Sequence, residues 1–125
     1  MTDTNANALV WVEIPVTNMD SAIKYYNSVF EFTLTIDETG PNPMAMFPDN
    51  NAQGTAGHLY PGKPAVDGQG PTPHLAIQGK LEDAIDRCNA AGGRVLGPIV
   101  TIPPGRFVYT QDPDGNSIGM FEVAM

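Results

Sequence analysis

The chain has 125 residues, of which 42% are hydrophobic, and its formal net charge is −8. This length fits one compact domain or two small, closely packed modules. Its six basic residues are scattered, and no apolar run approaches the roughly 20 residues of a membrane-spanning helix, so composition argues against nucleic-acid binding and against any association with a membrane.

The first half of the chain alternates in a strand and helix pattern. Residues 1–8 form a polar segment that lacks the basic and apolar parts of a signal peptide. Residues 9–16 are rich in β-branched side chains and predict a strand, and the apolar spacing over 18–30 predicts a helix with Asn18 as its N-cap. Short strands are expected at about 32–37, 43–48 and 54–60. Residues 9–60 are therefore predicted to form one βαβββ module.

Glycine and proline dominate residues 61–72, which we expect to connect two halves and to hold neither a helix nor a central strand. The same order of elements recurs in 73–125. The pattern predicts a strand at 73–78, a helix over 80–91 that ends at Gly92, and strands at about 94–101, 106–111 and 117–123. The repetition predicts an α+β fold built from two βαβββ modules.

The single cysteine, Cys88, lies on the apolar face of the second predicted helix. We expect it to be packed in the core rather than to act as a nucleophile. One cysteine excludes an internal disulfide and is typical of a reducing compartment. Together with the polar N-terminal segment, this indicates a cytoplasmic location.

Each half of the chain has one aliphatic face and one mixed face, because neighbouring residues on a strand point to opposite sides. Two mixed faces turned toward each other would line a cavity with a few polar groups, as is usual for a small-molecule site. Arg106, at the start of a strand, is a further candidate to hold an anionic group, although a solvated arginine is the alternative. The mixed-face candidates for ligand binding are Trp11, Glu13, His58, Tyr60, His74 and Phe121.

Three stretches resemble the vicinal oxygen chelate superfamily, which contains glyoxalases, bleomycin-resistance proteins and extradiol dioxygenases. They are 12–16 with the following helix to Phe30, 73–77 with 84–85 and 91–95, and 112–116 with 118–120. The resemblance implies an open, incomplete eight-stranded barrel around a cleft, formed by the two modules. It also implies a small-molecule partner and, as in many members, a homodimer, which would cover sheet edges that a chain of this size leaves exposed.

Metal-dependent members of that superfamily place one ligand on each of four strands. By position these ligands would be Trp11, His58, His74 and Gly119, and neither tryptophan nor glycine can coordinate a metal through its side chain. The site is therefore degenerate, and we expect no metal cofactor. If a divalent ion (zinc, iron, nickel or manganese) does bind, Glu13, His58 and His74 are its expected ligands.

The resemblance leaves the chemistry open. A small-molecule-binding, glyoxalase-like protein could be a lyase or dioxygenase relative in which Glu13 acts as base, whereas glyoxalase I activity is not expected because half of the ligand set is missing. The alternative is a metal-free protein that sequesters its ligand, as bleomycin-resistance proteins do, in an acidic and aromatic cleft. A third hypothesis is a metal-free enzyme that uses Glu13 and His74 as an acid–base pair.

Overall fold

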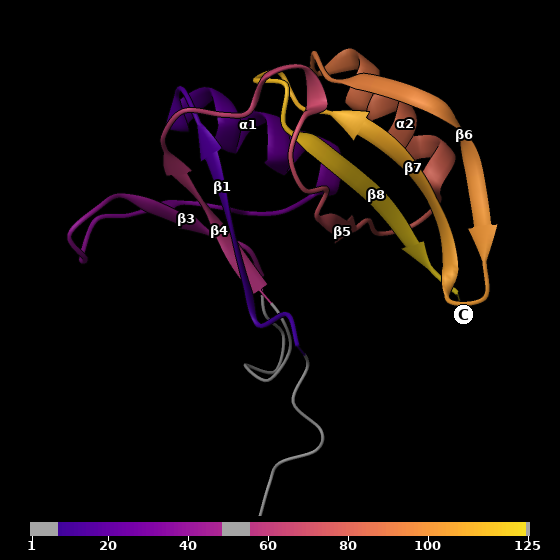
Figure 1. Cartoon of the computed structure of the whole chain (residues 1–125), viewed down its shortest axis with the longest axis horizontal. Coiled ribbons are helices and arrows are strands. Elements are labelled where there is room, and N and C mark those ends of the chain that lie inside the picture. Colours follow the sequence, from indigo (N-terminus) through magenta and orange to yellow (C-terminus); the bar gives the residue numbers. More distant parts are fainter. Residues whose placement is uncertain (1–7, 49–55, 125) are drawn as a thin grey trace, which may run out of the picture.

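The computed structural model describes residues 8–48 and 56–124 and contains two βαβββ modules (Figure 1). Module 1 consists of β1 (Trp11–Val16), α1 (Met19–Phe30), β2 (Ile36–Asp37), β3 (Met44–Met46) and β4 (Ala56–Pro61). Module 2 consists of β5 (His74–Ala76), α2 (Leu81–Ala90), β6 (Arg94–Ile102), β7 (Gly105–Gln111) and β8 (Ser117–Val123). The repeated order of elements predicted from the sequence is confirmed. None of the described helices is long and apolar enough to cross a bilayer.

Each module contributes one four-stranded sheet with the same topology. The strand orders are β1-β4-β3-β2 and β5-β8-β7-β6, with β1 parallel to β4, β5 parallel to β8, and the remaining pairs antiparallel. The two sheets stay open and do not close into a complete barrel. The α+β fold expected from the sequence, with an incomplete eight-stranded arrangement, is therefore confirmed.

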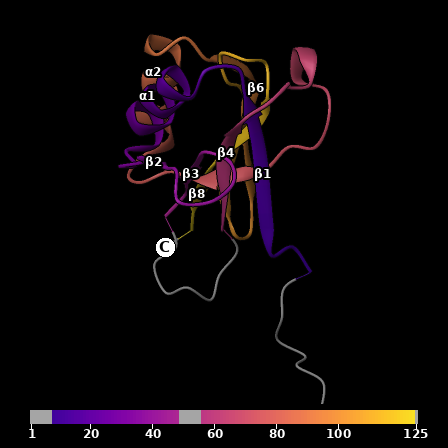
Figure 2. The same ribbon diagram turned by 90° about the vertical axis from the view of Figure 1, so that its left-hand side faces the viewer.

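The two helices lie on the same side of the two sheets (Figure 2). They contact each other through the Tyr25 hydroxyl, which is 3.4 Å from Sγ of Cys88, and through Nε of Arg87, which donates to the Val29 carbonyl at 2.9 Å. Side chains from both modules form one hydrophobic core, and Cys88 is fully buried in it, as predicted. Burial is also the main reason why the pKa of the Cys88 thiol is raised.

Local hydrogen bonds define the ends of the helices. The Asn18 side chain accepts from the Ser21 backbone N–H at 2.9 Å, which confirms Asn18 as the N-cap of α1. α1 ends at Phe30 and is capped by Glu31, which adopts a left-handed conformation with φ of 59°. α2 is followed by Gly92 with φ of 97°, the conformation that made glycine the predicted end of this helix.

Two segments differ from the prediction. The strand expected at 32–37 is reduced to two residues, because the Asn27 side chain bonds both backbone groups of Leu34, at 2.8 and 3.3 Å, and keeps them out of the sheet. The connection at 61–72, expected to hold no helix, contains one 3-10 turn at Val66–Gly68, and the Gly68 N–H is bonded to the Gly115 carbonyl at 2.8 Å. Residues 54 and 55 of the predicted fourth strand lie outside the described residues.

The turn between β7 and β8 also links the two modules. Its buried Asp112 accepts a hydrogen bond from the hydroxyl of Tyr26 on α1 at 2.7 Å. Asp114 accepts from the Thr17 hydroxyl at 2.6 Å, and the Asn116 amide donates to the Pro15 carbonyl at 2.8 Å. Burial, followed by the Asp112 carboxylate, raises the pKa of Tyr26 well above its ordinary value, so this hydroxyl stays a donor.

Candidate functional site

The orientation of side chains on the strands follows the predicted alternation. Ile14 on β1 and Met120 on β8 are buried under the helices, with 3% and 0% exposure. Trp11 and Phe121 on the same strands lie on the opposite sides, where the aromatic contacts described below are made. We call the sheet sides turned away from α1 and α2 the open faces.

The open face of module 1 carries three neighbouring polar side chains, Trp11, Glu13 and His58, called here the polar group. Glu13 and His58 are directly opposite each other on the parallel strands β1 and β4. The Trp11 indole N–H donates to Nδ1 of His58 at 2.9 Å, and Nε2 of His58 lies 3.6 Å from Oε2 of Glu13. Tyr60 packs edge-on to His58, with ring centroids 6.1 Å apart.

The open face of module 2 carries four rings, His74, Phe107, Tyr109 and Phe121, called here the aromatic group. The His74 ring is edge-on to the other three, at centroid distances of 5.0, 5.8 and 6.1 Å, and Phe107 and Phe121 are stacked. Partial burial among these rings lowers the pKa of His74 below its ordinary value of 6.5, which favours the neutral imidazole near neutral pH.

Gly119 provides the space in which the His74 ring lies. The two residues are partners in the β5–β8 ladder, and a Cβ at position 119 would come within 2.2 Å of Nδ1 of His74. A side chain at this position would therefore displace the ring. The position that the family resemblance assigns to a metal ligand is instead covered by the neighbouring histidine.

The residues at the four inherited ligand positions do not fit a divalent metal ion. Trp11 has only an N–H, which is already donated to His58, and Gly119 has no donor side chain. Glu13 and His58 belong to the polar group, whereas His74 belongs to the aromatic group. Over residues 8–48 and 56–124, no three histidine, cysteine, aspartate or glutamate side chains are close enough to hold a metal ion. A single chain thus does not bring Glu13, His58 and His74 together as a ligand set.

Arg106 lies on the other side of the module 2 sheet, toward α2. Its guanidinium forms two hydrogen bonds of 2.9 Å to the carboxylate of Glu82 and also contacts the carboxylate of Glu122. Glu122 in turn accepts from the Leu81 N–H at the start of α2. The structure therefore does not bring Arg106 to the open face, where the sequence analysis had considered it as a ligand contact.

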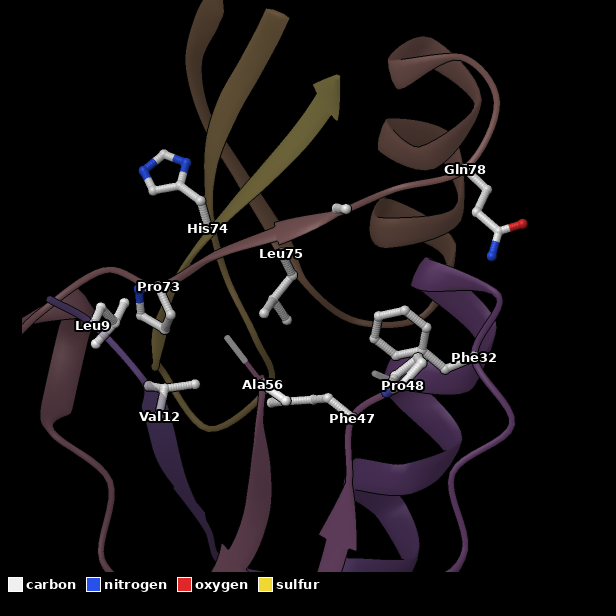
Figure 3. A pocket seen from close by; sticks show the side chains of 11 residues that line it. Leu9, Val12, Phe32, Phe47, Pro48, Ala56, Pro73, His74, Leu75 and Gln78 are labelled. Atoms are coloured by element: carbon white, nitrogen blue, oxygen red, sulfur yellow. The ribbon is translucent and has the colours of Figure 1, made fainter. Parts of the chain in front are cut away.

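A cavity of about 750 Å³ lies where the two modules meet (Figure 3). Leu75 of β5 points into it, and His74 borders it with its ring on the other side of that strand. Its size is within the range of small-molecule sites, but its walls are mostly apolar and are shared with the core. The lining residues are Leu9, Val12, Phe32, Phe47, Pro48, Ala56, Pro73, His74, Leu75, Ala76 and Gln78.

Two members of the aromatic group, Phe107 and Tyr109, were not among the candidates from the sequence. The sequence does contain an indication of their position. Both residues are adjacent to Val108 on β7, so they point to the other side of the sheet, and Val108 is fully buried. Arg106 is two residues from Val108 and therefore points to the same side of the sheet as Val108. Applying the two-residue period to β7 would thus have found both rings and placed the arginine correctly.

The family model of the Glyoxalase/Bleomycin resistance protein/Dioxygenase superfamily matches residues 8–120. Among solved structures, a superfamily member from Sphaerobacter thermophilus DSM 20745 is 20% identical, with a TM-score of 0.64 and coverage of 93% of this chain and 97% of that one. TnmS3, an antibiotic binding protein from Streptomyces sp. CB03234, is 22% identical, with a TM-score of 0.64 and coverage of 98% and 100%. A glyoxalase-related enzyme from Fulvimarina pelagi is 17% identical, with a TM-score of 0.65 and coverage of 93% and 88%.

No match is found among curated proteins. The structural similarities, all below 25% identity, establish the fold, and the family model covers most of the sequence. The chain therefore belongs to the Glyoxalase/Bleomycin resistance protein/Dioxygenase superfamily.

Proposed function

We propose that this protein binds a small aromatic molecule at its open faces and does so without a metal ion. The observation that carries the proposal is the aromatic group, in which a largely neutral His74 and three further rings form a platform against which a planar ligand can stack. Tyr109 and Trp11 keep 44% and 39% of their surface exposed, so rings on both modules are accessible to a ligand.

Charge supports a neutral or cationic ligand over an anionic one. The net charge is −8, and Glu13, the carboxylate of the polar group, has a side chain that is 64% exposed. Arg106, the cation considered for ligand anions, is bound to two carboxylates on the far side of its sheet. Antibiotic binding by the structural neighbour TnmS3 is consistent with a sequestering role, which is the alternative that the sequence analysis left open.

The test is a binding screen with planar aromatic compounds in neutral, cationic and anionic series, followed by calorimetry on the full chain. Neutral or cationic compounds are expected to bind, and Tyr109→Ala is expected to weaken binding by about tenfold because it removes one stacking ring. Ile102→Ala, which removes a half-exposed residue of the same sheet outside the aromatic group, is the matched control and should bind as wild type. Absence of binding in every series, or equal losses in both variants, would refute the proposal.

We also propose a two-fold homodimer in which a second copy of the chain helps to cover the open faces. Met46, whose partner in the β3–β4 ladder is His58, is 39% exposed, and Trp11 and Tyr109 are similarly accessible. Exposed apolar side chains on the open faces of both modules are typical of an interface. Sedimentation analysis should give twice the chain mass, and Met46→Lys should shift the equilibrium toward the monomer. A monomer at high protein concentration would contradict this assembly.

A further inference from the structure

The polar group of module 1 fixes the position of the proton on His58. An indole nitrogen can donate a hydrogen bond but cannot accept one, so Nδ1 of His58 must be the acceptor of the 2.9 Å bond from Trp11. A neutral imidazole carries its single proton on the other nitrogen, which is Nε2. Trp11 therefore holds His58 in the tautomer with the proton on Nε2.

The proton on Nε2 points toward the Glu13 carboxylate but does not form a hydrogen bond with it. The distance of 3.6 Å from Nε2 to the Glu13 carboxylate is longer than a hydrogen bond, and in the described part of the chain no other atom accepts from Nε2. The His58 side chain is 8% exposed, whereas the Glu13 side chain beside it is 64% exposed. A donor and an acceptor thus lie side by side at the surface of module 1.

We propose that Nε2–H of His58 and the Glu13 carboxylate together recognise a ligand that has a hydrogen-bond acceptor next to a donor, as in a lactam or a primary amide. The ligand carbonyl accepts from His58, and the adjacent ligand N–H donates to Glu13. Trp11 is the positioning residue, because the opposite tautomer would offer the ligand an acceptor in place of a donor. This inference rests on the proposed binding of an aromatic molecule. It adds that such a molecule carries an amide or lactam.

Two aromatic probes that differ in one hydrogen bond test the inference. α-Pyridone has the required carbonyl and N–H, and its N-methyl derivative keeps the ring and the carbonyl but lacks the donor. Trp11 is the only tryptophan of the chain, so its fluorescence reports binding at the polar group. Wild type should bind α-pyridone about tenfold more tightly than the N-methyl derivative, which corresponds to one hydrogen bond to a charged acceptor.

Variants separate the carboxylate from the rest of the site. Glu13→Ala should bring the ratio of the two affinities close to one, and Glu38→Ala, which removes an exposed glutamate elsewhere on module 1, should leave the ratio unchanged. Equal binding of the two probes to wild type, or binding of neither while other aromatic compounds bind, would overturn the lactam assignment and leave the proposed function intact. Failure of all aromatic compounds would overturn both.

The tautomer is measured independently of any ligand. The chain has two histidines, so nitrogen NMR of the full-length protein at about pH 8.5, well above the ordinary range of histidine, resolves both rings once the His74→Gln variant has assigned them. His58 should carry its proton on Nε2 in wild type, and Trp11→Phe should increase the population with the proton on Nδ1. A proton on Nδ1 in wild type, or no change in Trp11→Phe, would show that Trp11 does not position His58.

Discussion

Gly119→Ala is the substitution whose effect follows most directly from the geometry of the open faces. A Cβ at this position would lie 2.2 Å from Nδ1, 2.5 Å from Cε1 and 2.7 Å from Cγ of His74, although ordinary contacts begin at 3.4 Å. The ring must therefore move by about 1 Å or more, and its edge-on neighbours, of which Phe107 is nearest at 5.0 Å, oppose the movement. Such overpacking typically costs about 1–3 kcal/mol.

A second effect has the opposite sign. Alanine restricts the unfolded chain more than glycine does, which stabilises the fold by about 0.4–1 kcal/mol wherever the backbone conformation is allowed. Gly119 has no positive φ, so this gain applies. The net result expected for Gly119→Ala is a loss of about 1–2 kcal/mol in the free energy of unfolding, together with a displaced His74 ring.

Urea unfolding of a double-mutant cycle isolates the clash. In a His74→Ala background, Gly119→Ala should be neutral or slightly stabilising, because the ring that it meets is gone. Gly40→Ala, at a position with open space around the new Cβ, is the control and should not destabilise either background. If Gly119→Ala costs the same free energy with and without His74, the ring is not what fills the space at this glycine, and the assignment of the aromatic group is wrong.

Three further results are expected. Tyr26→Phe should lower the free energy of unfolding by about 1.5–3 kcal/mol, because buried Asp112 loses a charge-assisted hydrogen bond of 2.7 Å, and an unchanged urea midpoint would exclude this role. Because the pKa of His74 is lowered in the folded chain, the unfolded chain takes up a proton first as pH falls through about 6.5, so the free energy of unfolding should decrease there. A His74→Gln variant whose free energy of unfolding has the same pH dependence would contradict this origin. Hydrogen bonds from Arg106 lower the pKa of Glu82 from 4.5 to about 2, so its stabilising effect is complete above pH 4.5 and disappears as pH falls toward 2, and carbon NMR of that carboxyl should show no titration near pH 4.5.

The sequence was sufficient to predict the two modules and the orientation of most strands. Local periodicity assigns Leu59 and its neighbour His58 to opposite sides of the sheet, and likewise Ile118 and Gly119, without any knowledge of the fold. The order of elements was predicted correctly because each helix has a start or stop signal in the sequence. These signals are Asn18 before α1 and Gly92 after α2. The short β2 could not be predicted, since it depends on a side-chain bond from α1 to the backbone of the following segment.

The grouping of the candidate residues could not be predicted for a different reason. That Trp11 donates to His58 depends on the parallel register of β1 and β4, which are separated by most of module 1, and periodicity does not define register between distant strands. The sequence therefore suggested Glu13, His58 and His74 as one set, whereas the fold divides them between two open faces. Arg106 was considered for its charge alone, and its two carboxylate partners lie on α2 and β8.

The turn at 112–116 makes module 1 depend on module 2 for the partners of its polar groups. Asp112 belongs to module 2 but satisfies a buried hydroxyl of module 1, and Asn116 satisfies the Pro15 carbonyl in the same way. A module 1 fragment expressed alone would leave the Tyr26 hydroxyl and the Pro15 carbonyl without these partners and would expose the surface of α1 that packs against α2. Although each module has the complete βαβββ topology of an independent unit, the two halves are expected to melt in a single calorimetric transition.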